Sequence, residues 1–357
     1  MQRKRMDLPL HSGRCPRWLF GKMRKLAGLI SQIIIEEKGP DFFLERLSSP
    51  FWFQAFGCVL GFDWHSSGLT TTVCGALKEA FKDLKGLGVY VCGGKGLTSR
   101  KTPEEIKAIA EKKGFDPEKL IFASKFTAKV DNNCVQDGFQ LYHHSFIFSK
   151  KGRWIVIQQG MRDNWARRYH WDSQDLTSFI KEPHRGVVSD KFFLTLNLVD
   201  REKDSLRNSM KELSQRPPHK NLKDIIKIKE NQAQLPLRHR VLIEDINPKR
   251  LKETLLITYE KKPQDFQALL GLEGVGLKTL RALALISDLI YGESLSFKDP
   301  ARFSFAHGGK DGHPYKISLS HYQKTIEVLE KAVKKAKVER QDKFKALERL
   351  HSFYIRN

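Results

Sequence analysis

The sequence predicts an α+β protein, with a mixed α/β N-terminal domain followed by an all-α C-terminal domain. Three observations support this fold class. Residues 139–160 place aromatic and β-branched residues on either side of a turn, which is the pattern of a β-hairpin. Residues 16–38 repeat apolar side chains at helical spacing, and residues 263–357 look helical throughout. A length of 357 residues suits two or three domains.

Helices are expected first in the N-terminal domain. The segment 16–38 forms an amphipathic helix if its apolar residues share one face; these are Leu19, Met23, Leu26, Ile30, Ile33 and Ile34. A second helix is expected from about Thr70 to Leu84. Gly88–Cys92 predicts a buried strand, and a glycine-rich loop follows it. A third helix is expected to have Thr102 as its N-cap, with Glu105 placed for a capping box.

The hairpin pattern gives the sheet of this domain. Phe139–Phe148 and Trp154–Gln158 are the two expected strands, and Ser149–Gly152 supplies the turn between them. Aromatic residues alternate with arginines from Trp165 to Trp171. This run predicts either a helix with one buried face or a platform on which unpaired bases stack.

Composition divides the chain into three parts. Residues 1–200 are expected to be the mixed α/β domain and to hold any catalytic site. Residues 201–262 contain the Pro217-Pro218 pair, many lysines and few aromatics, which predicts a basic, exposed connector with helical pieces. Residues 263–357 are expected to form a helical domain that ends in one long basic helix, from about Leu319 to Tyr354.

The charge of the chain favours a polyanionic partner. Sixty-three Lys and Arg against 41 Asp and Glu leave a formal net charge of +22, and cations that neutralise phosphates release condensed counterions. DNA, ribosomal RNA and an anionic membrane surface all fit this charge. No apolar run reaches the roughly 18–20 residues needed to span a bilayer. The five cysteines are scattered with no CxxC, which suits the reducing cytoplasm.

A short glycine motif in the C-terminal domain narrows the choice of partner. The run Leu272-Glu273-Gly274-Val275-Gly276 precedes a helix expected to begin near Leu277. It resembles the helix-hairpin-helix of DNA repair and recombination proteins, LPGVGxKTA, with Glu273 in place of the proline and Leu280 in place of the alanine. The resemblance implies contacts to the DNA backbone. The residues it implicates are Gly274, Val275, Gly276, Lys278, Thr279 and Arg281. An ordinary αα-hairpin with a glycine turn is the alternative interpretation.

A glycine-rich loop predicts a phosphate site in the N-terminal domain. Gly93–Arg100 lies between the expected strand and the third helix, and it offers Lys95, Ser99 and Arg100 as phosphate ligands. Its spacing matches neither the P-loop nor the dinucleotide fingerprint. A connecting loop with no ligand explains the same residues.

Carboxylates and histidines in the same domain suggest acid–base or metal chemistry. Neighbouring side chains in a strand face opposite ways, so His143 and His144 cannot enter one pocket together. The expected catalytic residues are Asp63, His65, Asp131, Asp137 and His144. Asp63, Asp131 and Asp137 are the expected ligands of Mg²⁺ or Mn²⁺. A hydrogen-bonded core histidine is the alternative for His144. The strand–turn–strand layout resembles metal-dependent nucleases of the restriction-enzyme type, although Gln158-Gln159-Gly160 stands where their D/ExK triplet falls.

Several unusual motifs along the chain resemble one protein family. They are Leu8–Gly13, Gly61–Gly68, Leu141–His144 and Phe303–Gly312. Together they are similar to the prokaryotic domain-of-unknown-function family 763. This resemblance implies a prokaryotic source and implies no activity.

Three functions fit the sequence. The first is a repair or recombination nuclease that cuts DNA phosphodiesters in the cytoplasm, associated with the nucleoid. The second is a helix-hairpin-helix DNA glycosylase/lyase that uses Lys278 as nucleophile, with Asp299 or Asp311 as its partner. The third is a DNA-binding partner protein with no enzymatic activity. DNA is the expected partner in all three, and no membrane is expected.

Overall fold

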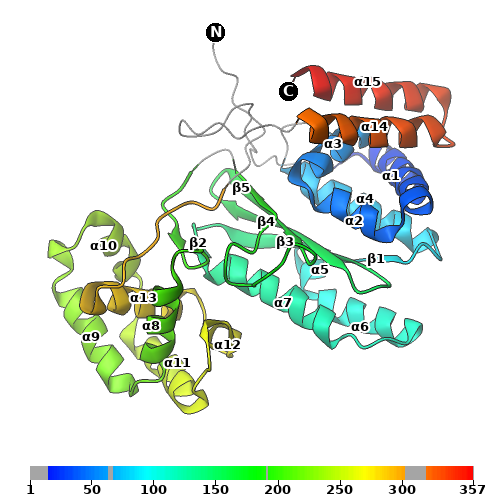
Figure 1. Cartoon of the computed structure of the whole chain (residues 1–357). Helices are drawn as coiled ribbons and strands as arrows, with labels where there is room; N and C mark the ends of the chain where they lie inside the picture. The colour runs from blue at the N-terminus through cyan, green and yellow to red at the C-terminus, as the bar shows by residue number, and fades with distance from the viewer. Residues whose placement is uncertain (1–14, 63–66, 190–191, 302–318, 357) are drawn as a thin grey trace, which may run out of the picture.

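The computed structural model describes residues 15–62, 67–189, 192–301 and 319–356, and it confirms the α+β class. Within this part of the chain, an antiparallel sheet of five strands lies between two layers of helices (Figure 1). Asp63, His65 and Asp311, which the sequence proposed for catalysis, lie outside the described residues. None of the described helices is long and apolar enough to cross a membrane.

The strand order of the sheet is β1-β3-β4-β5-β6, and each neighbouring pair is antiparallel. The expected hairpin is confirmed as β3 and β4, with its turn after Ser149. The strands are β1 (Val89–Lys95), β3 (Gln140–Ser149), β4 (Trp154–Arg162), β5 (Trp165–Asp172) and β6 (Gly186–Val188), and a separate pair joins β2 (Val135–Gln136) to β7 (Leu196–Asn197). The aromatic and basic run from Trp165 to Trp171 is therefore a central strand rather than a helix.

One face of the sheet, here called the first face, packs against N-terminal helices. Ile147, Ile155 and Ile157 point from the sheet into this core. Two C-terminal helices lie on the outer side of the same layer, where Arg349 Nη1 donates to the carbonyl of Val59 at 3.0 Å. The helices of this layer are α1 (Arg17–Lys38), α2 (Pro40–Ser48), α3 (Pro50–Leu60), α4 (Gly68–Asp83), α14 (Leu319–Lys335) and α15 (Arg340–Arg356).

The opposite side, the second face, packs against the remaining helices. Phe146, Trp154 and Trp171 point into this core, which is continuous with the core of the C-terminal helices. Helices α6 (Thr102–Lys113) and α7 (Glu118–Asn133) lie below the sheet in Figure 1, and the short α5 (Leu97–Arg100) follows the edge strand β1. Beyond them lie α8 (Asp204–Ser214), α9 (Pro218–Glu230), the 3₁₀ turn η1 (Gln232–Gln234), α10 (Leu237–Glu244), α11 (Pro248–Lys261), α12 (Phe266–Gly271) and α13 (Leu277–Tyr291).

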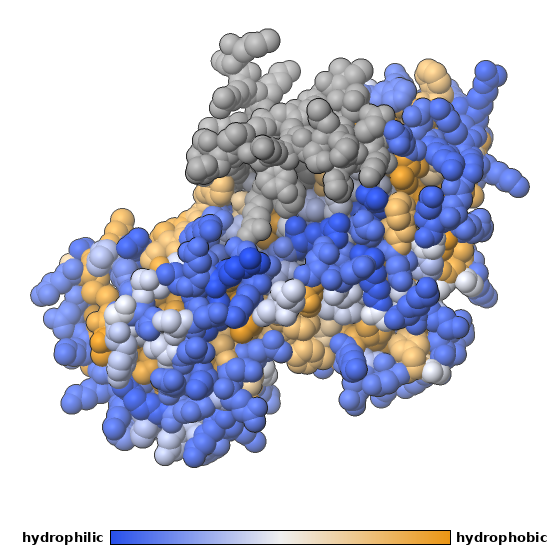
Figure 2. All heavy atoms as spheres, in the orientation of Figure 1, coloured by the Kyte–Doolittle hydropathy of each residue, from blue (hydrophilic) through white to orange (hydrophobic). Residues whose placement is uncertain are grey.

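The segment 201–262 is not the exposed connector that its composition suggested. Its helices α8 to α11 bury apolar residues in the same core as α12 and α13, among them Leu213, Ile225 and Leu255. The lysines occupy the outward faces, and the surface of this helical body is mostly hydrophilic (Figure 2). The average composition of the segment did not reveal its buried faces, because a helix of this kind needs only three or four apolar residues per two turns to reach the core.

Two local expectations are corrected. The single long C-terminal helix is divided into α14 and α15, which pair side by side. Thr102 is not the N-cap of α6, because Lys101 takes that position and the Thr102 hydroxyl donates to the carbonyl of Ser99 at 2.6 Å. Glu105 binds across to the sheet and does not form a capping box; its Oε2 accepts the backbone N–H of Gly93 at 2.7 Å.

Two neighbouring leucines of α11 test whether residues 201–262 belong to the core. Leu255 is 1% exposed and Leu256 is 47% exposed. We expect Leu255→Ala to lower the free energy of unfolding by about 2–5 kcal/mol, because it leaves a cavity. Leu256→Ala, the matched control, should change it by only about 0.5 kcal/mol. Urea denaturation measures both, and equal small effects would contradict the buried placement of α11.

Candidate functional site

Pairs of polar residues interrupt the three central strands although both faces of the sheet are covered. His143-His144 on β3, Gln158-Gln159 on β4 and Arg168-Tyr169 on β5 are all buried. The register sets His143, Gln159 and Arg168 side by side, and it sets His144, Gln158 and Tyr169 side by side. Residues directly opposite each other in a sheet share a face. We call these two rows, with their partners, the polar belt, and the opposite orientations of His143 and His144 confirm the sequence prediction.

On the first face, Gln159 joins the sheet to the start of α4. Its Nε2 donates to the carbonyl of Ser67 at 2.8 Å and to the hydroxyl of Tyr142 at 2.5 Å. Its Oε1 accepts the hydroxyl hydrogen of Thr70. The amide of one glutamine therefore fixes the entry of α4, just after the part of the Gly61–Gly68 motif that the structure does not describe.

Arg168 is the charged member of this row. Its guanidinium donates to Gln54 Oε1 at 3.1 Å, to Thr70 Oγ1 at 3.3 Å and to His170 Nε2 at 2.8 Å. The guanidinium carbon also lies 4.9 Å from the centre of the Phe53 ring. Burial, followed by the charge of Arg168, lowers the pKa of His170 well below its usual range. His170 is therefore neutral and serves as a hydrogen-bond acceptor.

On the second face, five side chains form a continuous hydrogen-bonded chain. His184 Nε2 lies 2.5 Å from Asp131 Oδ1, and Gln158 Nε2 donates to Asp131 Oδ2 at 2.6 Å. Because the amide nitrogen of Gln158 is used in this way, its Oε1 accepts from His144 Nδ1 at 2.7 Å. The Nε2 of a neutral His144 then accepts the hydroxyl hydrogen of Ser124, 2.9 Å away.

This row of hydrogen bonds has the direction needed to activate a hydroxyl. His144 Nε2 accepts from Ser124 Oγ, while His144 Nδ1–H donates to Gln158. Burial lowers the pKa of His144, although its hydrogen bond to Gln158 and the charge of Asp131 oppose the shift. Ser124 is only 3% exposed. In this conformation the five hydrogen-bonded side chains stabilise the core and do not reach a substrate.

Asp137 and Arg167 form a second buried group on the same face. Asp137 Oδ2 accepts from Arg167 Nη1 at 2.7 Å and from the Tyr169 hydroxyl at 2.9 Å. Arg167 Nη2 also donates to Asp299 at 2.7 Å. Burial raises the pKa of Asp137, and the positive charge of Arg167 opposes this. Burial alone would lower the pKa of Arg167, but Asp137, Tyr169 and Asp299 outweigh it, so Arg167 stays charged. Gly160 makes room for Phe139, whose ring lies under the guanidinium.

The expected metal ligands have protein partners where the structure describes them. Asp131 accepts from Gln158 and Trp171 and contacts His184, while Asp137 pairs with Arg167. Within the described ranges, no three His, Cys, Asp or Glu side chains gather closely enough to hold a metal ion. A site for Mg²⁺ or Mn²⁺ at Asp63, Asp131 and Asp137 stays a prediction, since Asp63 lies outside the described residues.

Hydrogen bonds within the expected phosphate loop, and from α4, fix the loop in place. The hydroxyl of Ser99 donates to the carbonyl of Gly96 at 2.6 Å, and Lys78 Nζ donates to the carbonyl of Gly93 at 2.7 Å. Lys95 and Arg100 are exposed, and Lys95 Nζ lies 5.7 Å from the centre of the Tyr142 ring. Phosphate binding by this loop stays a prediction.

The sequence missed the residues that complete these networks. Ser124, His184 and Arg167 belong to different elements, and no spacing in the chain joins them. The available signal was the adjacent polar pair in the middle of each of two apolar strands. In a sheet covered on both faces, such a pair requires one polar network on each face.

The glycine motif forms a tight hairpin between α12 and α13. Gly274 has φ +77°, where a side chain is strained, and Val275 is 2% exposed and belongs to the core of the helical body. Lys129 Nζ of α7 donates to the carbonyl of Leu272 at 2.7 Å. Burial lowers the pKa of Lys129. The negative charge of Glu273, which replaces the motif's proline, opposes this shift. The hairpin is thus held against the end of α7.

The six residues implicated in DNA contact differ in how far they are open to a ligand. Gly274 and Lys278 are exposed and Gly276 is partly exposed, while Val275 and Thr279 are buried. Arg281 has an internal role, because it donates to Gln136 Oε1 at 2.9 Å and to Asp245 Oδ1 at 2.7 Å. Lys278 Nζ lies 3.1 Å from the carbonyl of Asp245. Asp299, named as its glycosylase partner, instead binds Arg167.

Fold and site together define an α+β protein with a polar belt inside its sheet and a glycine hairpin in its helical body. The chain belongs to DUF763, a family of proteins of unknown function, whose family model matches residues 4–317. This confirms the resemblance seen in the sequence motifs. Helices α14 and α15 lie beyond the matched residues. No curated protein and no solved structure matches the chain.

Acid stability tests the neutral state of the buried histidines. Burial, followed by the electrostatic influence of the neighbouring His144 and Lys95, lowers the pKa of His143 from 6.5 to about 3. Below pH 6.5 the unfolded chain binds a proton at this position and the folded chain does not. The free energy of unfolding therefore falls as the pH falls from 6.5 to about 3, by about 1.4 kcal/mol per pH unit for one such group.

We expect His143→Asn to reduce this loss of stability between pH 6.5 and about 5, measured by urea denaturation at each pH. His219→Asn, which changes an exposed histidine of α9, is the control and should leave the pH dependence unchanged. An identical pH dependence in wild type and His143→Asn would contradict a neutral His143.

Proposed function

We propose that this protein binds DNA, as a protein of repair or recombination type, and that the hairpin Leu272–Gly276 contacts the phosphate backbone. One observation carries the proposal. Val275 is buried in the core of the helical body, while Gly274 beside it lies at the surface in a conformation that favours glycine. This combination brings bare backbone, with no side chain in the way, to the point where α13 begins.

The start of α13 is suited to an anion. Its first backbone N–H groups have no partner within the helix, and no side chain caps them. The helix dipole adds positive potential at the same point. Lys129 and Gln136 bind the carbonyls of Leu272 and Leu277. Because these contacts fix the hairpin before DNA arrives, binding costs less conformational entropy.

The charge of the molecule favours the same partner. The net charge of +22 attracts a polyanion from a distance, and Lys278 places an exposed ammonium group beside the hairpin. Contacts of this kind read the backbone and carry no sequence preference. The cytoplasm, in association with the nucleoid, is the compartment that such a protein requires.

Replacing Gly276 tests the hairpin. Its φ of −132° suits any residue, and an added Cβ would meet Asn133 Oδ1 at 3.6 Å, an ordinary contact. Gly276→Val should therefore fold normally and keep a phosphate away from the amides. We expect about tenfold weaker duplex binding by fluorescence anisotropy, since hydrogen bonds to a charged group are lost.

Gly271→Val is the matched control, because Gly271 is exposed at the end of α12 and its added Cβ would meet only the Phe126 ring, at 4.0 Å. Wild-type binding should also weaken as salt rises, with a slope of about −0.9 per neutralised phosphate in logarithmic units. Equal affinities for the two valine variants would exclude the hairpin as the contact surface.

The polar belt supports a second proposal, that the protein cuts DNA. The Leu141–His144 motif lies within the belt, and the described end of the Gly61–Gly68 motif is bound to it through Ser67. Asp63 and His65 belong to that second motif. A metal-dependent phosphodiesterase would use Asp63 with Mg²⁺ or Mn²⁺ and would depend on the belt to position the motif.

Incision assays on single-stranded, nicked, flapped and damaged DNA separate the enzymatic alternatives. For a nuclease, we expect metal-dependent cutting that Gln159→Leu greatly reduces, because it releases Ser67 and the start of α4, and that Lys278→Ala leaves intact. Circular dichroism and thermal melting show whether each variant is folded. For a glycosylase/lyase, borohydride would trap the protein on damaged DNA and Lys278→Ala would abolish trapping. Neither incision nor trapping on any substrate would leave DNA binding as the activity of the protein.

A further inference from the structure

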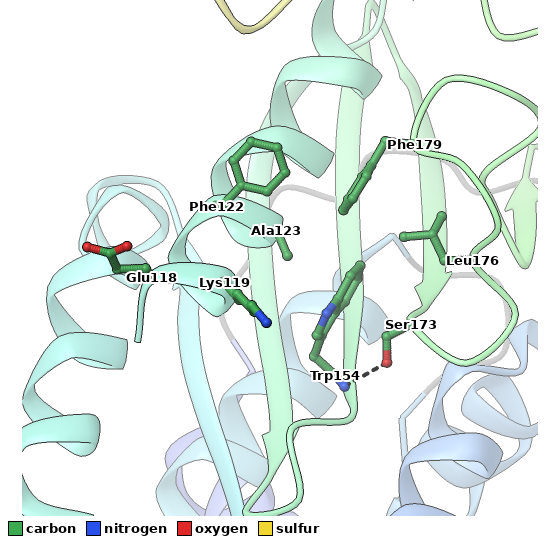
Figure 3. A pocket seen from close by; sticks show the side chains of 8 residues that line it. All are labelled: Glu118, Lys119, Phe122, Ala123, Trp154, Ser173, Leu176 and Phe179. Atoms are coloured by element: carbon green, nitrogen blue, oxygen red, sulfur yellow. Dashed lines mark hydrogen bonds between the residues drawn. The ribbon is translucent and has the colours of Figure 1, made fainter. Parts of the chain in front are cut away.

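We propose that an aromatic pocket on the second face of the sheet holds one unpaired base of a DNA strand. This rests on the proposed DNA binding and adds the form of DNA that the protein recognises. The pocket lies between the first turns of α7 and the segment that follows β5 (Figure 3). Its volume is about 570 Å³, within the range of roughly 300–1,000 Å³ that small-molecule sites occupy.

Three rings form the walls of the pocket. Trp154 and Phe179 are nearly parallel, with ring centres 6.1 Å apart and 13° between their planes. Phe122 meets Phe179 edge-on, with ring centres 5.7 Å apart. Figure 3 shows Phe122, from α7, facing Phe179, from the segment after β5. Phe122 is 46% exposed, so much of its apolar surface is left for another flat ring to cover.

The rim of the pocket has both charges. Glu118 and Lys119 line it, and the Lys119 side chain extends toward Trp154 in Figure 3. Neither side chain has an ion-pair or hydrogen-bond partner among the residues that the structure describes. A nucleotide offers a flat base for the rings, N–H donors for the carboxylate and a phosphate for the ammonium. A purely apolar ligand would leave both charges unused.

Helix α7 joins this pocket to the hairpin. Phe122, Lys125 and Lys129 follow one another at spacings of three and four residues, so they lie along one side of the helix. Lys129 binds the hairpin carbonyl of Leu272. Lys129 follows Lys119 by ten positions, a rise of about 15 Å along the helix, since each residue of an α-helix rises about 1.5 Å. A strand bound at the hairpin can therefore follow the lysines of α7 to the pocket within a few nucleotides.

Binding of a short oligothymidylate to the full-length protein tests the pocket. We expect it to quench tryptophan fluorescence, and we expect Phe122→Ala to weaken this binding by about tenfold, because one base loses its stacking partner. Lys119→Ala should also weaken it, and both variants should leave duplex binding nearly unchanged. Because Phe122 is half-exposed, its truncation should leave the fold intact, which thermal melting checks.

Matched controls change the same residue types elsewhere. Phe344→Ala removes a ring that is 68% exposed on α15, and Lys107→Ala removes an exposed lysine of α6. Both should bind oligothymidylate as the wild type does. The proposal is overturned if the wild type does not bind oligothymidylate, or if Phe122→Ala binds no more weakly than Phe344→Ala.

The hairpin variant separates this inference from the proposed function. Gly276→Val should lose duplex affinity but retain fluorescence quenching by thymidine monophosphate, which is too small to reach from the pocket to the hairpin. Quenching by the monophosphate together with wild-type duplex affinity in Gly276→Val would support the pocket and reject the hairpin. Duplex binding that depends on Gly276, without any quenching by nucleotides, would support the hairpin and reject the pocket.

Discussion

The double-sided burial of the sheet is the constraint on which the rest of the structure depends. Helices cover both faces of β3, β4 and β5, so a polar side chain in these strands has no access to water and must find a partner inside the protein. The belt meets this requirement with amides and hydroxyls around Gln159 on one face and with carboxylates around Gln158 on the other. Adjacent residues of one strand thereby bind the two helical layers to each other through the sheet.

Loss of a single partner in the belt would lower the free energy of unfolding, because it leaves a buried polar group unsatisfied. The belt is also where the family-like motifs meet the described structure, at Leu141–His144 and Ser67. A network that fixes the start of α4 through Gln159 and Thr70 also fixes the place from which the preceding motif extends. A structural role at these residues is therefore compatible with the proposed cleavage of DNA, for which a rigid support would position the preceding motif.

Helix α7 has a comparable double role on the second face. Its inner side supplies Ser124 and Asp131 to the belt, its end holds the hairpin through Lys129, and its first turns form a wall of the aromatic pocket. The proposed contacts to DNA backbone and to an unpaired base thus share one rigid element. Their spacing is fixed by the length of the helix and does not depend on a flexible linker.

The sequence by itself determined the elements whose signals are local. Helical spacing predicted α1, turn residues predicted the β3–β4 hairpin, and the glycine motif predicted the turn before Leu277 with Val275 buried. Tertiary structure decided what depends on distant partners. The lysine-rich segment 201–262 became core because α8 to α13 pack together, and Asp137 became an ion-pair partner because β5 brings Arg167 to it. Local patterns record backbone preference and burial, whereas the partner of a buried charge is set by how distant segments of the chain pack against each other.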